Sequence, residues 1–209
     1  MARLKTFGAS FAAGRKIHNV PAMLAAKVEI RKRVLMAIGQ SARVFDAFAG
    51  GGQLYRRIWR EAAGYVGCDL DWHNDGRLAY VGDNRRVLRA IDLSNFAIFD
   101  LDAFGSPWQQ AWIIACRRLV KPGERVGLVL TEGSQIKLRF GSFPMALAFV
   151  AGLKGKPSGG AQLQAEILDR AIARLAGVMG CGIETRWQAT GKKGSRMRYI
   201  GLVLRGLGA

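Results

Sequence analysis

Acidic residues are scarce in this sequence. Fifteen Asp and Glu stand against 32 Lys and Arg, which gives a formal net charge of +17. In a folded domain, such a surplus of positive charge favours a polyanionic partner, usually nucleic acid and in some cases an acidic membrane surface. The alternative is a basic soluble protein that has no specific partner.

Cysteine and histidine are also few. The cysteines Cys68, Cys116 and Cys181 are odd in number and lack metal-ligand spacing, which excludes a disulfide framework and indicates reduced thiols in a cytoplasmic protein. Cys116 lies in an apolar helical stretch, and we expect it to pack in the core. The two histidines, His18 and His73, form no ligand cluster, so no metal site is expected.

Long apolar runs are missing as well. The longest, residues 145–153, is too short to span a bilayer, and no membrane contact is expected. The first 28 residues hold five basic residues and no signal-type apolar stretch, so they are expected to belong to the mature protein. Half of the residues are hydrophobic, which is enough to form a substantial core. The length of 209 residues suits one α/β domain and is too short for two.

The spacing of apolar residues predicts alternating helices and strands. Helices are expected over Pro21–Ile38, Gln53–Ala63, Arg85–Ala90, Pro107–Val120 and Ala161–Ala176. Strands are expected over Arg43–Phe48, Tyr65–Asp69, Ala79–Val81, Phe96–Leu101, Arg125–Thr131, Ile183–Ala189 and Met197–Leu204, with a long loop after Thr131. This order predicts a Rossmann-like α/β fold: a doubly wound, mostly parallel sheet with an antiparallel C-terminal hairpin.

Carboxylates gather where the predicted strands end. Asp46, Asp69, Asp83 and the pair Asp100/Asp102 each close one of the first four strands or stand beside its end. Ligands of open α/β sheets bind beyond the carboxyl ends of the strands. Carboxylates at four neighbouring strand ends of one sheet edge would repel each other unless they served ligand groups. We therefore place the ligand site at this edge.

The first of these strand ends is rich in glycine. Glycines at 50, 51 and 52 let backbone approach a ligand, and the helix that follows offers free N–H groups. A carboxylate such as Asp69 can accept two hydrogen bonds from ribose hydroxyls, and Asp83 with Asn84 suits an adenine edge. A nicotinamide-binding fingerprint requires a third glycine where this chain has Tyr55, which disfavours a dehydrogenase.

Taken with a Leu-Val-Lys-Pro-Gly element at residues 119–123, this set resembles class I S-adenosylmethionine-dependent methyltransferases over about residues 44–130. The resemblance implies S-adenosyl-L-methionine as cofactor. It also implies a catalytic domain over residues 41–209, with residues 1–40 as a basic N-terminal extension and helix packed on the core. The residues it implies in cofactor binding are Asp46, Phe48, Gly50, Gly52, Asp69, Leu70, Asp83 and Asn84.

The fourth strand end indicates the substrate. Methyl transfer to an exocyclic base nitrogen requires alignment and no covalent nucleophile. A carboxylate such as Asp102 can accept the amino hydrogen bonds and later the proton, while an aromatic ring such as Phe104 stacks on the base. Asp100 faces the same side of the strand, and either shares the proton-accepting role or belongs to the cofactor side. Methylation at a pyrimidine carbon would require a cysteine here, and there is none.

Residues 100–107, Asp-Leu-Asp-Ala-Phe-Gly-Ser-Pro, resemble the Asp-Pro-Phe-Gly motif of the tRNA (guanine-N2)-dimethyltransferase family, with Ala103 in place of proline. Asp83-Asn84 and residues 131–133 resemble that family's adenine-contact segment and its Thr-Asp-Gly element. Residues 19–23 loosely resemble an Asn-Pro-x-Met element, and this alignment puts Lys27 where the family has an arginine near the cofactor carboxylate. The resemblance implies methylation of guanine N2 in tRNA or other structured RNA, and so a role in tRNA processing.

Two alternatives remain open at this level. DNA amino-methyltransferases also carry Asp-x-Phe-Ala-Gly before their glycines, as residues 46–50 do here, and a methyltransferase-like fold could bind nucleic acid without catalysis. In the tRNA (guanine-N2)-dimethyltransferase family the catalytic domain is followed by an RNA-handling domain; we expect this sequence to hold the catalytic domain alone, and a protein partner could supply the other. The basic hairpin tip with Lys192, Lys193, Arg196 and Arg198 is expected to contact the nucleic-acid backbone; the alternative is a solvated turn.

Overall fold

The computed structural model describes residues 21–71, 73–134, 143–154, 163–191 and 197–208. These residues form a seven-stranded sheet in the order β3-β2-β1-β4-β5-β7-β6. The strands are β1 Arg43–Asp46, β2 Gly64–Asp69, β3 Ala79–Val81, β4 Ile98–Leu101, β5 Arg125–Glu132, β6 Cys181–Ala189 and β7 Arg198–Gly206. The first five run parallel, whereas β7 is antiparallel to both β5 and β6. The predicted mostly parallel sheet with an antiparallel C-terminal hairpin is confirmed.

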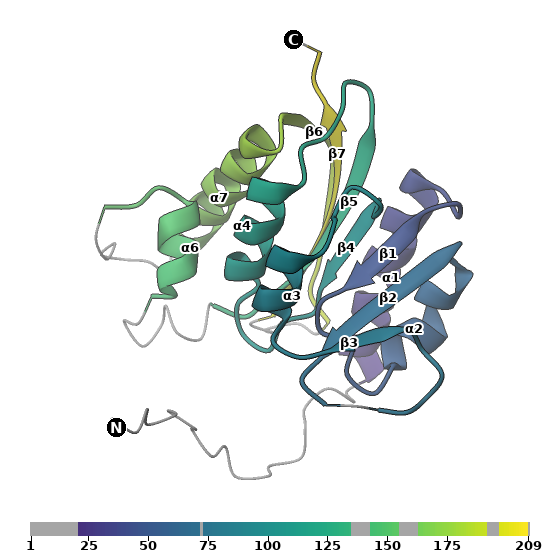
Figure 1. Cartoon of the computed structure of the whole chain (residues 1–209). Helices are drawn as coiled ribbons and strands as arrows, with labels where there is room; N and C mark the ends of the chain where they lie inside the picture. The colour runs from purple at the N-terminus through teal and green to yellow at the C-terminus, as the bar shows by residue number, and fades with distance from the viewer. Residues whose placement is uncertain (1–20, 72, 135–142, 155–162, 192–196, 209) are drawn as a thin grey trace, which may run out of the picture.

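Helices cover both faces of the sheet (Figure 1). They are α1 Pro21–Ile38, α2 Gln53–Arg57, α3 Asn84–Ala90, α4 Trp108–Arg117, α6 Met145–Val150 and α7 Gln164–Val178, together with the 3-10 turn η2 Trp59–Glu61. The helix α1 packs over β5 and β7 on one face, and α3, α4, α6 and α7 lie together on the other. No helix in the described part of the chain is long and apolar enough to cross a membrane.

Alternation along the strands divides the core into two layers. On β4, Ile98 packs toward α1, whereas its neighbour Phe99 packs with the helices of the opposite face. Val129 and Leu128 of β5 divide in the same way. Because both faces of the central strands are buried, these strands are mostly apolar, and Asp100 of β4 and Thr131 and Glu132 of β5 lie toward the carboxyl edge of the sheet.

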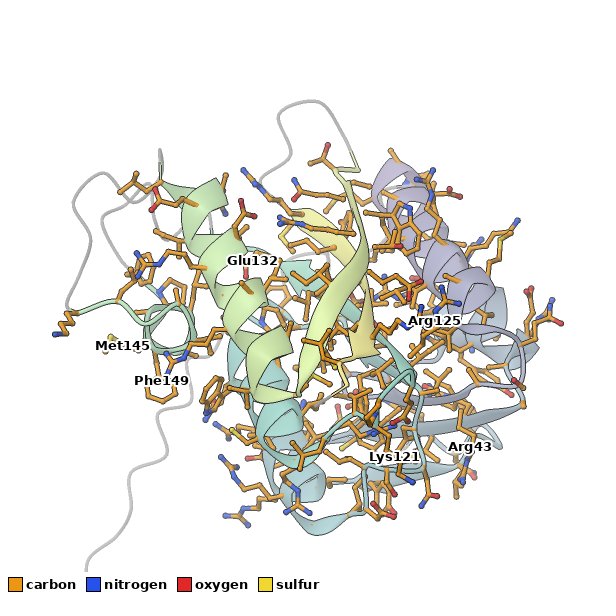
Figure 2. All side chains as sticks on the ribbon, turned by 90° about the horizontal axis from the view of Figure 1, so that it is seen from above. Arg43, Lys121, Arg125, Glu132, Met145 and Phe149 are labelled. Atoms are coloured by element: carbon orange, nitrogen blue, oxygen red, sulfur yellow. The ribbon has the colours of Figure 1, made fainter. Side chains whose placement is uncertain are left out.

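Three local expectations were wrong. The helix expected over residues 53–63 ends at Arg57 because Ile58, whose φ is −147°, breaks it; this break lets both Ile58 and Trp59 be buried. Part of the expected loop after Thr131 is the helix α6, which is too short to show a helical period in the sequence. Its Met145 and Phe149 point outward (Figure 2), with exposed fractions of 80% and 56%. Cys116 is exposed on α4 and is not part of the core.

Candidate active site

Two strand-end carboxylates are tied to the glycine turn and its surroundings. Asp46 ends β1 and is buried; it accepts hydrogen bonds from the Phe48 N–H (3.1 Å) and the Tyr65 hydroxyl (3.0 Å). Asp69 ends β2, and its Oδ2 accepts a hydrogen bond from the Gly50 N–H at 2.7 Å. This hydrogen bond ties Asp69 to the glycine turn, and a quarter of the Asp69 side chain stays exposed.

Glycine is required in this turn by backbone conformation. Gly52 N–H donates to the Ala49 carbonyl at 3.1 Å, and Gly50 and Gly52 have φ angles of +45° and +73°. A Cβ atom at Gly52 would lie 2.9 Å from the guanidinium of Arg77, which packs beneath the turn. Sequence reasoning missed Arg77, because nothing in its neighbourhood along the chain links it to residues 49–52.

The polar side chains after β3, those of Asp83 and Asn84, are hydrogen-bonded within the protein. Asp83 caps α3 by accepting the Arg85 N–H at 2.9 Å. The hydrogen bonds of Arg85 lower the pKa of Asp83 to about 2, so it is ionised at neutral pH. The amide of Asn84 donates to the Ala47 carbonyl (2.7 Å) and accepts from Gln110 (2.9 Å). The Asn84 side chain therefore ties α3 to β1 and α4 and does not point out as a free reader of an adenine edge.

Asp100, on β4, is enclosed beneath α1. Arg31 donates two hydrogen bonds to its carboxylate, from Nε and Nη2, both at 2.6 Å, and Trp59 Nε1 donates a third at 2.6 Å. Neither Arg31 nor Asp100 has any exposed side-chain surface. Of the two carboxylates considered for a proton-accepting role, Asp100 has no face open to a substrate. Its place is in the buried layer that anchors α1.

Asp102 follows β4 and has 14% of its side chain exposed. Its Oδ2 accepts from Lys27 Nζ at 2.7 Å and its Oδ1 from the Thr131 hydroxyl at 2.6 Å. Burial alone would raise the pKa of Asp102, but the charges of Arg31 and Lys27 outweigh it and hold the pKa below its usual value. Asp102 is therefore an ionised, firmly oriented acceptor. Lys27, expected near a cofactor carboxylate, is paired with Asp102 in this structure.

The loop after Asp102 is clamped to the end of β5. Gly133 N–H donates to the Gly105 carbonyl at 2.8 Å, and the indole of Trp108, the first residue of α4, donates to the buried carboxylate of Glu132. Between these anchors Phe104 is 81% exposed. The structure therefore brings an ionised carboxylate and an exposed aromatic ring together at the edge of the sheet that carries the glycine turn.

The remaining predicted residues are peripheral to this edge or outside the described ranges. Leu70 directly follows Asp69 and is 72% exposed, and Phe48 is partly buried against the core. Arg198 opens β7 and is paired in register with Glu132 of β5. Lys192, Lys193 and Arg196 lie outside the described residues. Among the residues that the structure does describe, no cluster of three His, Cys, Asp or Glu side chains could hold a metal ion.

Comparison with known proteins identifies the fold. No family model matches the sequence, and no curated protein matches it either. The solved structures that resemble the chain include Trm1 from Pyrococcus horikoshii with S-adenosyl-L-methionine (TM-score 0.58, 14% identity, 88% of this chain and 56% of that one), the N-methyltransferase NodS from Bradyrhizobium japonicum with S-adenosyl-L-homocysteine (0.55, 11%, 89% and 88%), and TYW2 from M. jannaschii with AdoMet (0.54, 10%, 87% and 77%).

The chain spans little more than half the length of the Pyrococcus horikoshii protein. At sequence identities this low, the structural similarity indicates a shared fold and does not indicate a shared substrate. The strand order, the antiparallel insertion of β7 and these likenesses agree with one another. The chain thus has the fold of the class I S-adenosylmethionine-dependent methyltransferases.

Proposed function

We propose that this chain is an S-adenosyl-L-methionine-dependent methyltransferase that acts on an exocyclic amino group of a nucleic-acid base, with guanine N2 in tRNA or other structured RNA as first candidate. The observation that carries the proposal is Asp102: an ionised carboxylate held at the carboxyl end of β4 beside the exposed ring of Phe104. Both lie at the same edge of the sheet as Asp69, which ends β2, and the glycine turn, which follows β1.

The glycine turn and Asp69 fit such a cofactor. Gly51 is exposed, and a Cβ atom there would meet nothing within 4 Å, so a ligand can approach the backbone closely. The part of Asp69 that remains exposed is available to ribose hydroxyls. The likeness to structures containing S-adenosyl-L-methionine and S-adenosyl-L-homocysteine supports the same choice. When bound, the cofactor supplies an electrophilic methyl group on a sulfonium centre.

The chain's own residues orient the acceptor nitrogen. Asp102 accepts an N–H bond of the base amino group and turns the nitrogen lone pair out of conjugation with the ring. Lys27 and Thr131 keep the carboxylate in place while this happens. Because the pKa of Asp102 lies below its usual value, the proton released after transfer passes to water and does not stay on the carboxylate.

Nucleic acid is favoured as substrate by charge and by Phe104. The net charge of +17 suits a polyanion, and an exposed aromatic ring beside the catalytic carboxylate suits stacking on an extruded base. The basic tip with Lys192, Lys193 and Arg196 would add phosphate contacts. The free cysteines support a reducing, cytoplasmic location.

The direct test is single-turnover transfer of a labelled methyl group to unmodified tRNA and to duplex DNA, followed by mass spectrometry of the nucleosides. Asp102→Asn should lower the rate by roughly a hundred- to a thousandfold, with cofactor affinity nearly unchanged. Glu29→Gln, which alters an exposed carboxylate on α1, is the matched control. Phe104→Ala should weaken substrate binding by about 1–3 kcal/mol.

Undiminished transfer by Asp102→Asn would remove the catalytic assignment. Transfer to DNA alone would favour the DNA amino-methyltransferase alternative. Nucleic-acid binding without transfer to either substrate would favour a non-catalytic binding protein.

A further inference from the structure

We infer that Lys27 determines which edge of the base this site accepts, by donating a hydrogen bond to the ring nitrogen that stands next to the target amino group. Lys27 and Asp102 then recognise the amino group and its neighbouring ring nitrogen as one unit. The inference rests on the proposed function and deepens it. It assigns to the substrate a residue that the sequence resemblance had placed near the cofactor carboxylate.

The ion pair with Asp102 leaves hydrogen-bond donors of Lys27 unused. Lys27 Nζ donates to Asp102 Oδ2 at 2.7 Å. An ammonium group has three N–H donors, and no further hydrogen-bond acceptor for this Nζ is found among the described residues. A tenth of the Lys27 side chain is exposed, beside the 14% of Asp102. Lys27 therefore keeps donors for a ligand that reaches Asp102.

Two further contacts fix where these donors lie. Lys27 Nζ lies 5.9 Å from the ring centre of Tyr199, a buried residue of β7, so the ring covers one side of the ammonium group. The backbone carbonyl of Lys27 accepts a hydrogen bond from Arg31 Nη1 at 3.0 Å, and Arg31 is itself bound to Asp100. A lysine side chain is normally flexible, but here it is held at both ends. Its remaining donors are therefore pre-organised, which lowers the cost of binding a ligand.

The two oxygens of Asp102 differ in what they can still accept. Oδ1 accepts the Thr131 hydroxyl at 2.6 Å and also lies 3.5 Å from Arg31 Nη2. Oδ2 is bonded to Lys27 and, like any carboxylate oxygen, has a second lone pair. The target amino group therefore binds Oδ2, which brings it next to the Lys27 ammonium group.

Guanine, adenine and cytosine share an arrangement of atoms that fits this pair. In each base, the carbon that carries the amino group also carries a ring nitrogen with a free lone pair, which is N3 in guanine, N1 in adenine and N3 in cytosine. The amino N–H donates to Asp102 Oδ2 while the ring nitrogen accepts from Lys27 Nζ, so the hydrogen bonds close a ring.

The same pair rejects other edges. Uracil presents the reverse pattern, a carbonyl oxygen beside an N–H, which would place acceptor against acceptor at Asp102 and donor against donor at Lys27. Guanine turned to its other side would place its N1–H against Lys27. The pair therefore selects an amino base, and in guanine it selects the side that carries N3.

Replacing one ring atom of the substrate tests the inference. The base that accepts the methyl group is identified by mass spectrometry, and the nucleic acid is then made with 3-deazaguanine, 1-deazaadenine or 3-deazacytosine at that position, so that C–H replaces the ring nitrogen. Wild type should transfer at least about tenfold more efficiently to the natural base, since a hydrogen bond from a charged donor is lost in the analogue. Lys27→Met should reduce this ratio by about tenfold, whatever it does to both rates.

Two control variants separate recognition of the base from positioning of Asp102. Thr131→Val removes the other anchor of Asp102 at a buried residue, so it should slow transfer to both substrates and leave their ratio unchanged. Lys32→Met removes an exposed charge from the same helix and should also leave the ratio unchanged. Calorimetry adds a readout that does not depend on transfer: Lys27→Met should bind S-adenosylhomocysteine as wild type does.

Equal ratios in wild type and Lys27→Met would overturn the inference. A loss in Lys27→Met confined to binding of S-adenosylhomocysteine would also overturn it, because Lys27 would then serve the cofactor. A wild type that does not distinguish the natural base from its analogue would overturn it without any variant, so the test stands even if Lys27→Met fails to fold. These results would leave the proposed function intact, whereas absence of transfer by wild type to any RNA or DNA would overturn both.

Discussion

Replacing Arg31 with methionine should destabilise the protein strongly. Arg31 has no exposed surface and donates two 2.6 Å hydrogen bonds to Asp100, and its Nη2 also lies 3.5 Å from Asp102. Arg31→Met keeps the aliphatic volume but removes the charge. Asp100 would then be a buried carboxylate with Trp59 as its remaining donor.

The magnitude follows from what is left unpaired. Removing one partner of a buried ion pair costs about 3–5 kcal/mol of unfolding free energy, because the other charge stays buried without compensation. At about 2–4 °C per kcal/mol for a chain of this size, the melting temperature should fall by roughly 6–20 °C. The double variant Arg31→Met/Asp100→Leu removes both charges and should recover most of the loss.

Urea denaturation of wild type, of Arg31→Met, of Asp100→Leu and of the double variant gives the coupling energy between Arg31 and Asp100 directly. Arg31→Lys belongs in the series, because it keeps the charge without the bidentate fork and should fall between wild type and Arg31→Met. A loss below about 1 kcal/mol in Arg31→Met, the range of an exposed pair, would refute the reasoning.

Three further predictions concern stability. Burial, with the charge of Asp100, raises the pKa of Asp46 to about 8. Between about pH 4 and pH 8, Asp46 is therefore protonated in the folded chain and ionised in the unfolded chain. The free energy of unfolding should fall as the pH rises through this range. Denaturation at several pH values should show that slope flattened in Asp46→Asn. Asp83→Ala should cost about 1 kcal/mol through loss of the α3 cap, measured against Arg85→Ala, which leaves the cap in place. Gly206→Ala should cost about 1–3 kcal/mol, because its Cβ would overlap the Lys121 carbonyl; Gly208→Ala, with nothing within 4 Å, should stay within about 0.5 kcal/mol.

Local patterns were enough to predict the fold and to place several candidate residues at the carboxyl edge of the sheet. Parallel strands are mostly apolar, and ligand groups gather where they end, so Asp69 at the end of β2 and Asp102 just after β4 could be placed from strand ends alone. The glycine turn needs positive φ at Gly50 and Gly52, and that requirement is visible as residue type.

The partners of these groups are separated along the chain and could not be read from local pattern. Arg31 and Asp100 are 69 positions apart, and Lys27 and Asp102 are 75 apart. One signal was available: Lys27 and Arg31 fall on the stripe of α1 that also holds Leu24, Val34 and Leu35. Two cations on an otherwise apolar helix face indicate buried acidic partners. Arg77 gives no comparable signal, because the backbone carbonyls of the glycine turn, to which it donates, carry no sequence information.

The docking of α1 has a consequence for how the protein is made. The helix rests on a surface that β7 completes: Ile30 and Val34 of α1 lie against Gly201, where a Cβ would come within 2.9 Å of each. β7 leaves the ribosome after every other strand, and it must insert between β5 and β6. Until then, α1 has only its contacts with β4 and β5, and the surface that holds Lys27 and Arg31 in place is incomplete. The charge environment of Asp102 should therefore become fully fixed only late in synthesis, when α1 and β7 meet.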